Sequence, residues 1–431
     1  MMKILVTGSK GQLGNEIRVL SKQFQGPEYV FVDVDELDIT DNNAVQQFFT
    51  KHQFDICINC AAYTAVDKAE SDATMAQKIN VTGVEYLANA CQKNDAVLFH
   101  ISTDFVFDGN ATAPIEVDAP VSPISVYGQT KAEGEYRALS LNKKTILIRT
   151  SWVYSFFGNN FVKTMIRLGK EKAELGVVDD QVGCPTYAAD LAMVIFEFIG
   201  RLEQVEYGIY HFSNAGVTSW CGFATKIMEL YGLPCKVNPI ATSQYPTPAK
   251  RPKYSVLNCN KTIQTLNISI PHWETALSQC IQLLKQQEML EQIDVKKIIA
   301  IAEEAGNEIM KIYDTDDFAV TDKSDNSPLT KADKAGNAVI VAALKNTYPE
   351  IPIISEENKM IEYADRKDWN YFWLVDPLDG TKEFIKKNGE FTVNIALIRD
   401  GKPVLGVVGI PAKNQMYYAV ENKGAYKIDE N

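Results

Sequence analysis

The chain has 431 residues, of which 46% are apolar and 23% are charged, a composition typical of globular domains and not of disordered chains. Its formal charge is −12 and it has no basic block, which argues against nucleic acid as a partner. No apolar run reaches the ~18 residues of a membrane span, and Ile4–Val6 is too short for a signal-peptide core. We therefore expect a cytoplasmic protein with no membrane partner.

Two or three domains are expected, because one domain takes roughly 150 residues. All eight cysteines and all four histidines precede residue 281. We predict a first unit over residues 1–288 and a second over 289–431. Scattered cysteines in a chain without a signal peptide predict reduced thiols. The Cys57–Cys60 pair has no second CxxC to complete a zinc site, so these are interpreted as buried thiols.

In the first unit, short apolar strands alternate with amphipathic helices. This alternation indicates an α/β fold with a doubly wound parallel sheet of Rossmann type, covered by helices on both faces. We expect a coenzyme core mainly over 1–155 and 173–204, and a smaller substrate lobe mainly over 156–172 and 205–252. The expected strands are 3–7, 29–33, 54–60, 96–103 and 145–154, and the first helices are 11–24 and 74–93.

A glycine-rich turn, Gly8-Ser9-Lys10-Gly11-Gln12-Leu13-Gly14, follows the first strand and opens a helix. Its glycines permit a tight turn and let backbone N–H groups approach a pyrophosphate at the helix N-terminus. The turn therefore predicts a dinucleotide site. Asp33, which ends the second strand, would accept hydrogen bonds from a ribose and favours NAD, whereas Lys10 is compatible with the 2′-phosphate of NADP. Both cofactors remain open.

A candidate catalytic set follows the strand over 96–103. That strand ends in Ser102-Thr103, and Tyr127 and Lys131 share one face of a later helix. A nearby ammonium lowers the pKa of a phenol, as a proton donor to a developing alkoxide requires. A second YxxxK pair, Tyr363–Lys367, lies in a charged stretch and is interpreted as solvated surface.

These motifs resemble the extended short-chain dehydrogenase/reductases, and longer segments resemble the dTDP-4-dehydrorhamnose reductases over nearly all of residues 2–285. The resemblance implies reduction of the C4 ketone of dTDP-4-dehydro-L-rhamnose to dTDP-L-rhamnose with NADH or NADPH, in dTDP-rhamnose and O-antigen polysaccharide biosynthesis. The segments that carry it are NCAAYTAVDKAESD (59–72), STDFVFDG (102–109), SVYGQTKAEGE (125–135), RTSWVY (149–154), NNFVKTM (159–165), DDQVGCPT (179–186) and YPTPAKRPKYSVLN (245–258).

The same resemblance implies residue roles. Tyr127 would protonate the C4 oxygen, Lys131 would lower its pKa and bind the nicotinamide ribose, and Thr103 would hydrogen-bond the ketone. Asp104, Trp152 and Arg251 match substrate positions, although Trp152 would also suit core packing and Arg251 the surface. The implied cofactor positions are Gly8, Lys10, Gly11, Gln12, Leu13, Gly14, Asp33, Asp38, Ile39, Ala61, Ala62, Tyr63, Thr103, Tyr127 and Lys131.

The family has also been associated with Mg²⁺ at a subunit contact. Glu16 and Asp190 are the candidates for that ion, and we expect a homodimer.

The second unit carries clustered carboxylates, Asp333, Glu356 and Asp376-Pro377-Leu378-Asp379-Gly380-Thr381, which suit Mg²⁺. WLVDPLDGTKEFIKKNGEFTVNIAL resembles the inositol-monophosphatase-like phosphatases, and within them the 3′(2′),5′-bisphosphate nucleotidases. The resemblance implies metal positions at Glu356, Asp376, Leu378 (carbonyl) and Asp379, with Thr381 orienting water. Family members continue for nearly as much chain again, so we expect a partial α+β domain from a gene fusion or frameshift. It should have an unpaired sheet edge and no nucleotidase activity.

Two other functions stay open. An epimerase or dehydratase on the same scaffold is one, although dehydratases typically place a second acid where Phe105 follows Asp104. A non-catalytic, nucleotide-binding regulatory subunit is the other, which has no need of Thr103, Tyr127 and Lys131. Net consumption of NAD(P)H separates a reductase from both.

Overall fold

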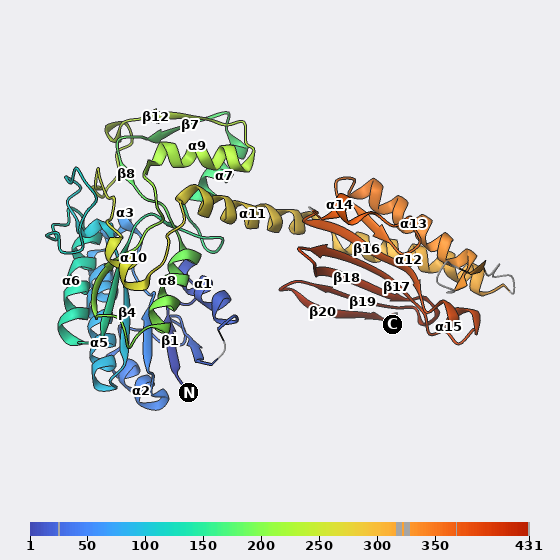
Figure 1. The fold of residues 1–431 in the computed structure, drawn as a ribbon, viewed down its shortest axis with the longest axis horizontal. Helices are drawn as coiled ribbons and strands as arrows, with labels where there is room; N and C mark the ends of the chain where they lie inside the picture. The colour runs from blue at the N-terminus through green and yellow to red at the C-terminus, as the bar shows by residue number, and fades with distance from the viewer. Residues whose placement is uncertain (25, 316–320, 323–327, 368, 430–431) are drawn as a thin grey trace. The chain divides into compact units, whose positions relative to one another are not determined.

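A computed structural model describes the chain except for residues 25, 316–320, 323–327, 368 and 430–431. The chain forms two compact units, Met1–Glu288 and Met289–Asn431 (Figure 1). No helix in the described ranges is long and apolar enough to cross a membrane. The eight cysteines all carry free thiols.

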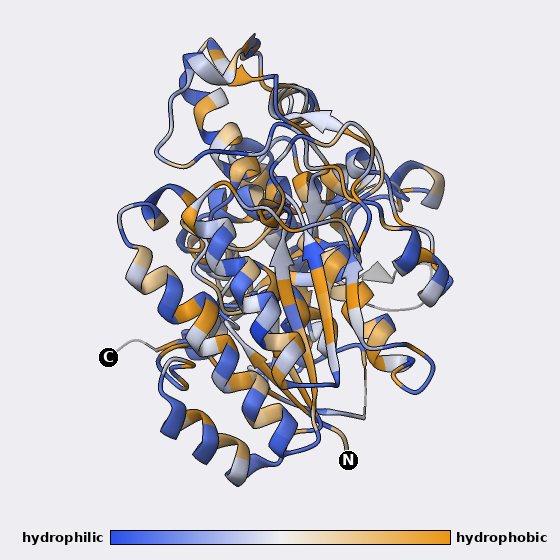
Figure 2. Cartoon of the chain, turned by 90° about the vertical axis from the view of Figure 1, so that its left-hand side faces the viewer, coloured by the Kyte–Doolittle hydropathy of each residue, from blue (hydrophilic) through white to orange (hydrophobic). Residues whose placement is uncertain are grey.

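The first unit is built on a six-stranded sheet with the order β10-β5-β4-β3-β1-β2. Every pair in it is parallel, which confirms the predicted Rossmann-type sheet. In Figure 2 these strands are mostly hydrophobic, whereas the surrounding helices mix hydrophobic and hydrophilic residues. The strands are β1 (Lys3–Thr7), β2 (Glu28–Phe31), β3 (Ile56–Asn59), β4 (Val97–Thr103), β5 (Thr145–Thr150) and β10 (Gly208–His211).

Both faces of this sheet are covered, because successive strand residues enter different cores. Ile4 and Val6 pack with residues of the helices on one face, and Leu5 packs with those on the other. This is the alternation expected of a strand buried on both sides. The helices of this part are α1 (Gln12–Ser21), α2 (Asn42–His52), α3 (Val66–Ala69), α4 (Ala73–Gln77), the π-helical η1 (Lys78–Gly83), α5 (Val84–Lys93), α6 (Val126–Leu141), α8 (Ala188–Gly200) and α10 (Asn260–Leu266).

A smaller set of elements forms a separate core that includes Phe223, Ile227 and Trp273. Its strands include the parallel pair β7–β12. The elements are α7 (Phe161–Glu171), β7 (Glu174–Val178), α9 (Trp220–Tyr231), β12 (Lys236–Ile240) and α11 (Trp273–Gln292), with the short β6 (Val153–Tyr154), β8 (Val182–Gly183), β9 (Thr186–Tyr187), β11 (Thr218–Ser219) and η3 (Thr242–Gln244). The short η2 (Asp104–Val106) instead follows β4, and its Val106 packs with Phe107 in a separate small cluster.

The strand expected over 145–154 is interrupted, and this part of the prediction was wrong. β5 ends at Thr150, and β6 belongs to a different sheet, where it pairs with β9. Trp152 lies between them with φ +48°, a left-handed conformation that turns the chain out of the main sheet. Apolar periodicity does not reveal such a turn.

The second unit is a mixed six-stranded sheet with the order β15-β16-β17-β18-β19-β20. β15 and β16 are parallel and the other neighbours antiparallel. Ile298 and Ile340 of two long helices share its core with Trp373. The elements are α12 (Val295–Tyr313), β13 (Thr321–Asp322), β14 (Pro328–Leu329), α13 (Lys331–Thr347), β15 (Ile353–Ser355), α14 (Tyr363–Arg366), β16 (Tyr371–Asp379), α15 (Thr381–Ile385), β17 (Thr392–Arg399), β18 (Lys402–Ile410), η4 (Pro411–Lys413), β19 (Gln415–Val420) and β20 (Gly424–Asp429).

Candidate active site

A cavity of about 890 Å³ opens beside the carboxyl ends of the parallel strands in the first unit. Gly8 follows β1, Thr103 ends β4 and Thr150 ends β5, and all three line it. This edge is where open α/β sheets bind ligands. The lining also includes Lys10, Gly11, Gln12, Leu13, Asp33, Asp38, Ile39, Ala61, Ala62, Asp104, Tyr127, Lys131, Trp152, Phe161, Trp220 and Arg251.

The glycine turn has the geometry that its sequence predicts. Gly8 has φ +61°, and a Cβ on it would lie 2.6 Å from the backbone nitrogen of Ala61. Gly11 begins α1 as an N-cap without a side-chain cap, so the first N–H groups of the helix remain free for an anion. Gly14 does not line the cavity; a Cβ there would lie 2.6 Å from the carbonyl oxygen of Gly8. Gly14 therefore allows close packing of the turn and the helix, and its predicted contact with the cofactor stays a prediction.

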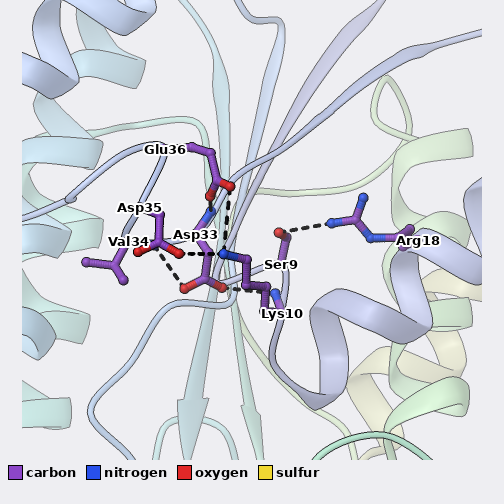
Figure 3. A network of polar contacts seen from close by, with 7 residues as sticks. All are labelled: Ser9, Lys10, Arg18, Asp33, Val34, Asp35 and Glu36. Carbon is purple, nitrogen blue, oxygen red and sulfur yellow. Dashed lines mark hydrogen bonds and ion pairs between the residues drawn. The ribbon is translucent and has the colours of Figure 1, made fainter.

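A charged network surrounds the turn (Figure 3). The Asp33 carboxylate accepts hydrogen bonds from the backbone nitrogens of Lys10 and Val34, both at 2.9 Å. The Lys10 ammonium lies 2.6 Å from Asp35 and 3.7 Å from Glu36, and its hydrogen bond to Asp35 raises the pKa of Lys10. An acid suited to ribose hydroxyls and a cation suited to a 2′-phosphate therefore stand side by side.

Four of the five residues predicted along the adenine and ribose path line the cavity, and one does not. Asp38 and Ile39 line the cavity, as do Ala61 and Ala62. Tyr63 is not among the lining residues, and its hydroxyl donates to Asp72 at 3.2 Å. Tyr63 therefore braces the neighbouring loop in this structure, and its predicted contact with the cofactor stays a prediction.

The three predicted catalytic residues converge. Thr103 hydrogen-bonds the buried Tyr127 hydroxyl, and the Lys131 ammonium donates to the carbonyl of Ile101 at 2.7 Å. α6 comes this close because Gly128 leaves room for the loop after β4, where a Cβ would lie 2.2 Å from the Phe105 carbonyl oxygen. Side chains from one strand end and one helix face thus meet at the cavity.

The predicted lowering of the Tyr127 pKa is not seen. Burial raises the pKa of Tyr127 to about 12, and the Thr103 hydrogen bond only partly opposes this. Burial also lowers the pKa of Lys131 to about 8. Burial is the largest cause of both shifts and the Asp104 charge adds to the rise at Tyr127, so Tyr127 is protonated at neutral pH.

Asp104 stands directly beside this set. It is 2% exposed, and one carboxylate oxygen accepts from the Thr103 hydroxyl at 2.9 Å. The other oxygen is buried without a hydrogen bond of ordinary geometry in the described structure, although the Ser255 hydroxyl lies close enough to lower the pKa of the carboxyl group. Burial has the larger effect and raises the pKa of Asp104 to about 6. A buried acceptor beside the cavity with such a weak partner suits a substrate hydroxyl.

Trp152 also lies at the cavity, where it stacks on Trp220 with ring centroids 3.7 Å apart and planes at 11°. Phe161 continues this aromatic wall, 4.6 Å from Trp220. Sequence reasoning missed Trp220, because nothing in the spacing of the two tryptophans indicates that the smaller lobe brings them together.

Arg251 lines the cavity, but it has a partner that was not predicted. Its guanidinium makes a paired contact with the Asp67 carboxylate at 3.0 and 2.7 Å, and it donates to Thr247 at 2.6 Å. This contact lowers the pKa of Asp67. The charge of Arg251 is therefore positioned beside the cavity and partly neutralised there.

The two candidate Mg²⁺ residues of the first unit each have a neutral partner. Glu16 accepts from Ser155 at 2.6 Å and Asp190 accepts from Asn214 at 2.6 Å. Burial raises the pKa of both acids, and Asp190 adds to the effect on Glu16. Within the described ranges, no three His, Cys, Asp or Glu side chains are grouped to hold a metal ion.

The carboxylates of the second unit lie near one another without forming such a group. Asp376 has a buried oxygen without a hydrogen-bond partner in the described part of the chain, and burial together with Glu356 and Asp379 raises its pKa. The Thr381 hydroxyl bridges Asp333 and the Leu378 carbonyl, both at 3.2 Å. Tyr363 of the second YxxxK pair is 69% exposed, as expected for a surface residue.

Two family models match the chain. Residues 2–286 match a model described as the RmlD substrate binding domain, and residues 289–430 match the inositol monophosphatase family. The two matches meet where the chain divides into its two compact units.

Similar proteins match the first unit along their whole length. A dTDP-4-dehydrorhamnose reductase of Aggregatibacter actinomycetemcomitans is 42% identical over 64% of this chain and 97% of its own. The spore coat polysaccharide biosynthesis protein SpsK of Bacillus subtilis is also 42% identical, over 65% of this chain and 98% of its own.

Solved structures agree. A dTDP-4-dehydrorhamnose reductase of Clostridium acetobutylicum has a TM-score of 0.64 and 46% identity, covering 66% of this chain and 100% of its own. The dTDP-4-dehydrorhamnose reductase of Bacillus anthracis in complex with NADP has a TM-score of 0.61 and 40% identity, covering 65% of this chain and 99% of its own. A UDP-glucose 4-epimerase of Thermus thermophilus, with 19% identity and a TM-score of 0.56, shares the fold alone.

Proposed function

We propose, from the premise that this chain belongs to the RmlD family over residues 2–286, that it reduces dTDP-4-dehydro-L-rhamnose to dTDP-L-rhamnose with NADH or NADPH. The observation that carries the proposal is the convergence of Thr103, Tyr127 and Lys131 in one cavity with a dinucleotide-type glycine turn. Such a set serves ketone reduction, because one oxygen gains negative charge and meets preorganised donors.

The protein's part in the reaction is to hold the ketone and deliver a proton. The glycine turn and Lys131 would hold NADH or NADPH, which would supply the hydride for C4 when bound. Tyr127 gives its proton to the C4 oxygen, and Thr103 hydrogen-bonds the same oxygen. Lys131 binds the nicotinamide ribose, and its ammonium offsets the negative charge that forms on Tyr127 as the proton leaves.

The remaining cavity residues select the substrate. Asp104 accepts a sugar hydroxyl, and Trp152 presents its ring face to the hexose, while Arg251 faces the diphosphate. The lobe over residues 156–172 and 205–252 closes this side of the cavity. Asp33 and Lys10 together accommodate either NADH or NADPH.

Mg²⁺ is proposed as a ligand of both units. Mg²⁺ at Glu16 and Asp190 would need further ligands, which a second copy in a homodimer would supply. The second unit carries only part of a phosphatase site, and we propose that it has no nucleotidase activity. No step of the reduction passes through a metal.

Stoichiometry is the test that separates the candidate functions. The full chain is incubated with dTDP-4-dehydro-L-rhamnose and NADPH, and the nucleotide sugars are identified by NMR. One NADPH oxidised for each dTDP-L-rhamnose formed is the expected result. A changed sugar without net oxidation would mean an epimerase or dehydratase, and bound cofactor without any product would mean a binding subunit.

A further inference from the structure

A buried ion pair lies directly behind the catalytic set and has no part in the mechanism above. The Arg149 guanidinium in β5 donates to Glu135 in α6, with an Nη2–Oε2 distance of 2.7 Å and an Nε–Oε1 distance of 2.9 Å. Arg149 is 2% exposed and Glu135 is 3% exposed. Removing two charges from water is costly, so a fully buried pair is weak evidence for stability and needs another explanation.

Glu135 also reaches the catalytic strand. Its Oε1 accepts a hydrogen bond from Ser102 at 2.5 Å, and Ser102 immediately precedes Thr103. Ser102 is the partner of Arg149 in the β4–β5 register. One carboxylate therefore ties together α6, β4 and β5 at the point where the catalytic residues emerge.

The same carboxylate faces the catalytic lysine. Glu135 follows Lys131 by one helical turn, on the face that also carries Tyr127. Lys131 is itself 2% exposed, and Glu135 is the acid that counteracts the effect of burial on its pKa. Tyr127 and Asp104 share the cavity with Lys131, and His100 of β4 lies near it, with a pKa far below its usual range because it is fully buried. His211 of β10, beside Arg149, has a pKa lowered to about 3 by burial. Neither histidine changes charge near neutral pH.

We propose that Glu135 is a positioning residue of this site: it holds Ser102 and α6 in place and supplies the negative charge that keeps Lys131 protonated, while Arg149 limits that charge by sharing it. The inference rests on the proposed function, because it assigns Lys131 a role in binding the nicotinamide ribose. A buried acid shared between a structural arginine and a catalytic lysine sets the pH range of activity from outside the cavity.

The test is the pH dependence of NADPH binding, followed by nicotinamide fluorescence on the full chain without sugar. Glu135→Gln keeps the shape and removes the charge, so the fall in affinity at alkaline pH should move to lower pH than in the unaltered protein. The matched control is Glu133→Gln, which removes a charge two residues away on the same helix from an exposed pair with Arg137. It should leave the profile unchanged.

A second variant keeps the test decisive if Glu135→Gln leaves Arg149 unpaired and fails to fold. Glu135→Gln/Arg149→Met removes both charges together, which folds more readily than a broken pair. Its profile should also move to lower pH. Unchanged profiles in a folded Glu135 variant, or equal shifts in the Glu133 control, would overturn the inference. Normal NADPH binding without turnover of the sugar would overturn only the proposed substrate, and no NADPH binding in the unaltered protein would overturn both.

Discussion

Gly8→Ala tests the close approach of the glycine turn to the backbone of Cys60 and Ala61. Gly8 has a positive φ, and an added Cβ would lie 2.6 Å from Ala61 N and 2.8 Å from Cys60 C, both backbone atoms that cannot rotate away. The left-handed conformation costs alanine about 1 kcal/mol. Forced overlap in a packed region adds roughly 1–3 kcal/mol. We therefore expect the free energy of unfolding of the first unit to fall by about 2–4 kcal/mol.

Gly232→Ala is the matched control, because Gly232 also has a positive φ (+82°) but no heavy atom would lie within 4 Å of its Cβ. It should cost only the conformational term, about 1 kcal/mol. Calorimetry of the full chain measures both variants, and the first unit's transition is the one that NADPH shifts upward. The Gly8 variant should in addition bind NADPH at least roughly tenfold more weakly, whereas the control binds normally. Equal losses of stability in the two variants would refute the close approach of the turn to Ala61.

Three further predictions concern the cavity and the second unit. Trp220→Ala should remove the stacking partner of Trp152 and raise KM for the sugar about threefold to tenfold, from ~0.5–1.5 kcal/mol of lost aromatic contact, with NADPH affinity unchanged; an unchanged KM would exclude Trp220 from the substrate wall. Burial raises the pKa of Asp104 from 3.8 to about 6, which disfavours the folded carboxylate by about 3 kcal/mol. Asp104 therefore stays protonated to higher pH in the native state than in the unfolded chain. The free energy of unfolding should fall by this amount as pH rises from about 4 to about 6. Urea unfolding of Asp104→Asn should lack that decline, and parallel pH curves for the two proteins would contradict the assignment. Finally, the full chain with Mg²⁺ should not hydrolyse adenosine 3′,5′-bisphosphate; phosphate release at an enzymatic rate would show a complete phosphatase site.

Local patterns predicted the parts of the site that lie close together in sequence. Gly8 and Gly11 follow a strand and open a helix, and Tyr127 and Lys131 share a helix face, so each pair could be placed before any tertiary contact was known. The alternation of strands and helices predicted that the strands are parallel. Parallel strands place Thr103, at the end of its strand, at the same edge of the sheet as the glycine turn.

Long-range packing decided the rest. The stack of Trp152 on Trp220 and the pairing of Arg251 with Asp67 join segments far apart in the chain, and neither has a local signal. The pKa of Tyr127 was predicted in the wrong direction, because spacing to Lys131 indicates a neighbouring charge but not how deeply both groups are buried. The motifs assigned Gly14 and Tyr63 to the cofactor, and they could not show that Gly14 also packs against Gly8 or that Tyr63 also hydrogen-bonds Asp72.

The most direct measurement of the central claim is the initial rate of NADPH oxidation with dTDP-4-dehydro-L-rhamnose in the unaltered chain and in Tyr127→Phe. The account predicts rapid oxidation by the unaltered chain and a loss of roughly 10²–10⁴-fold in the variant, which lacks the proton donor. NADPH should still bind to the variant, because the glycine turn and Lys131 are unaltered, and a direct binding measurement separates any loss of affinity from the loss of the proton donor. Equal rates in the two proteins would show that Tyr127 is not the proton donor, and no oxidation by an unaltered chain that binds NADPH would contradict the reductase itself.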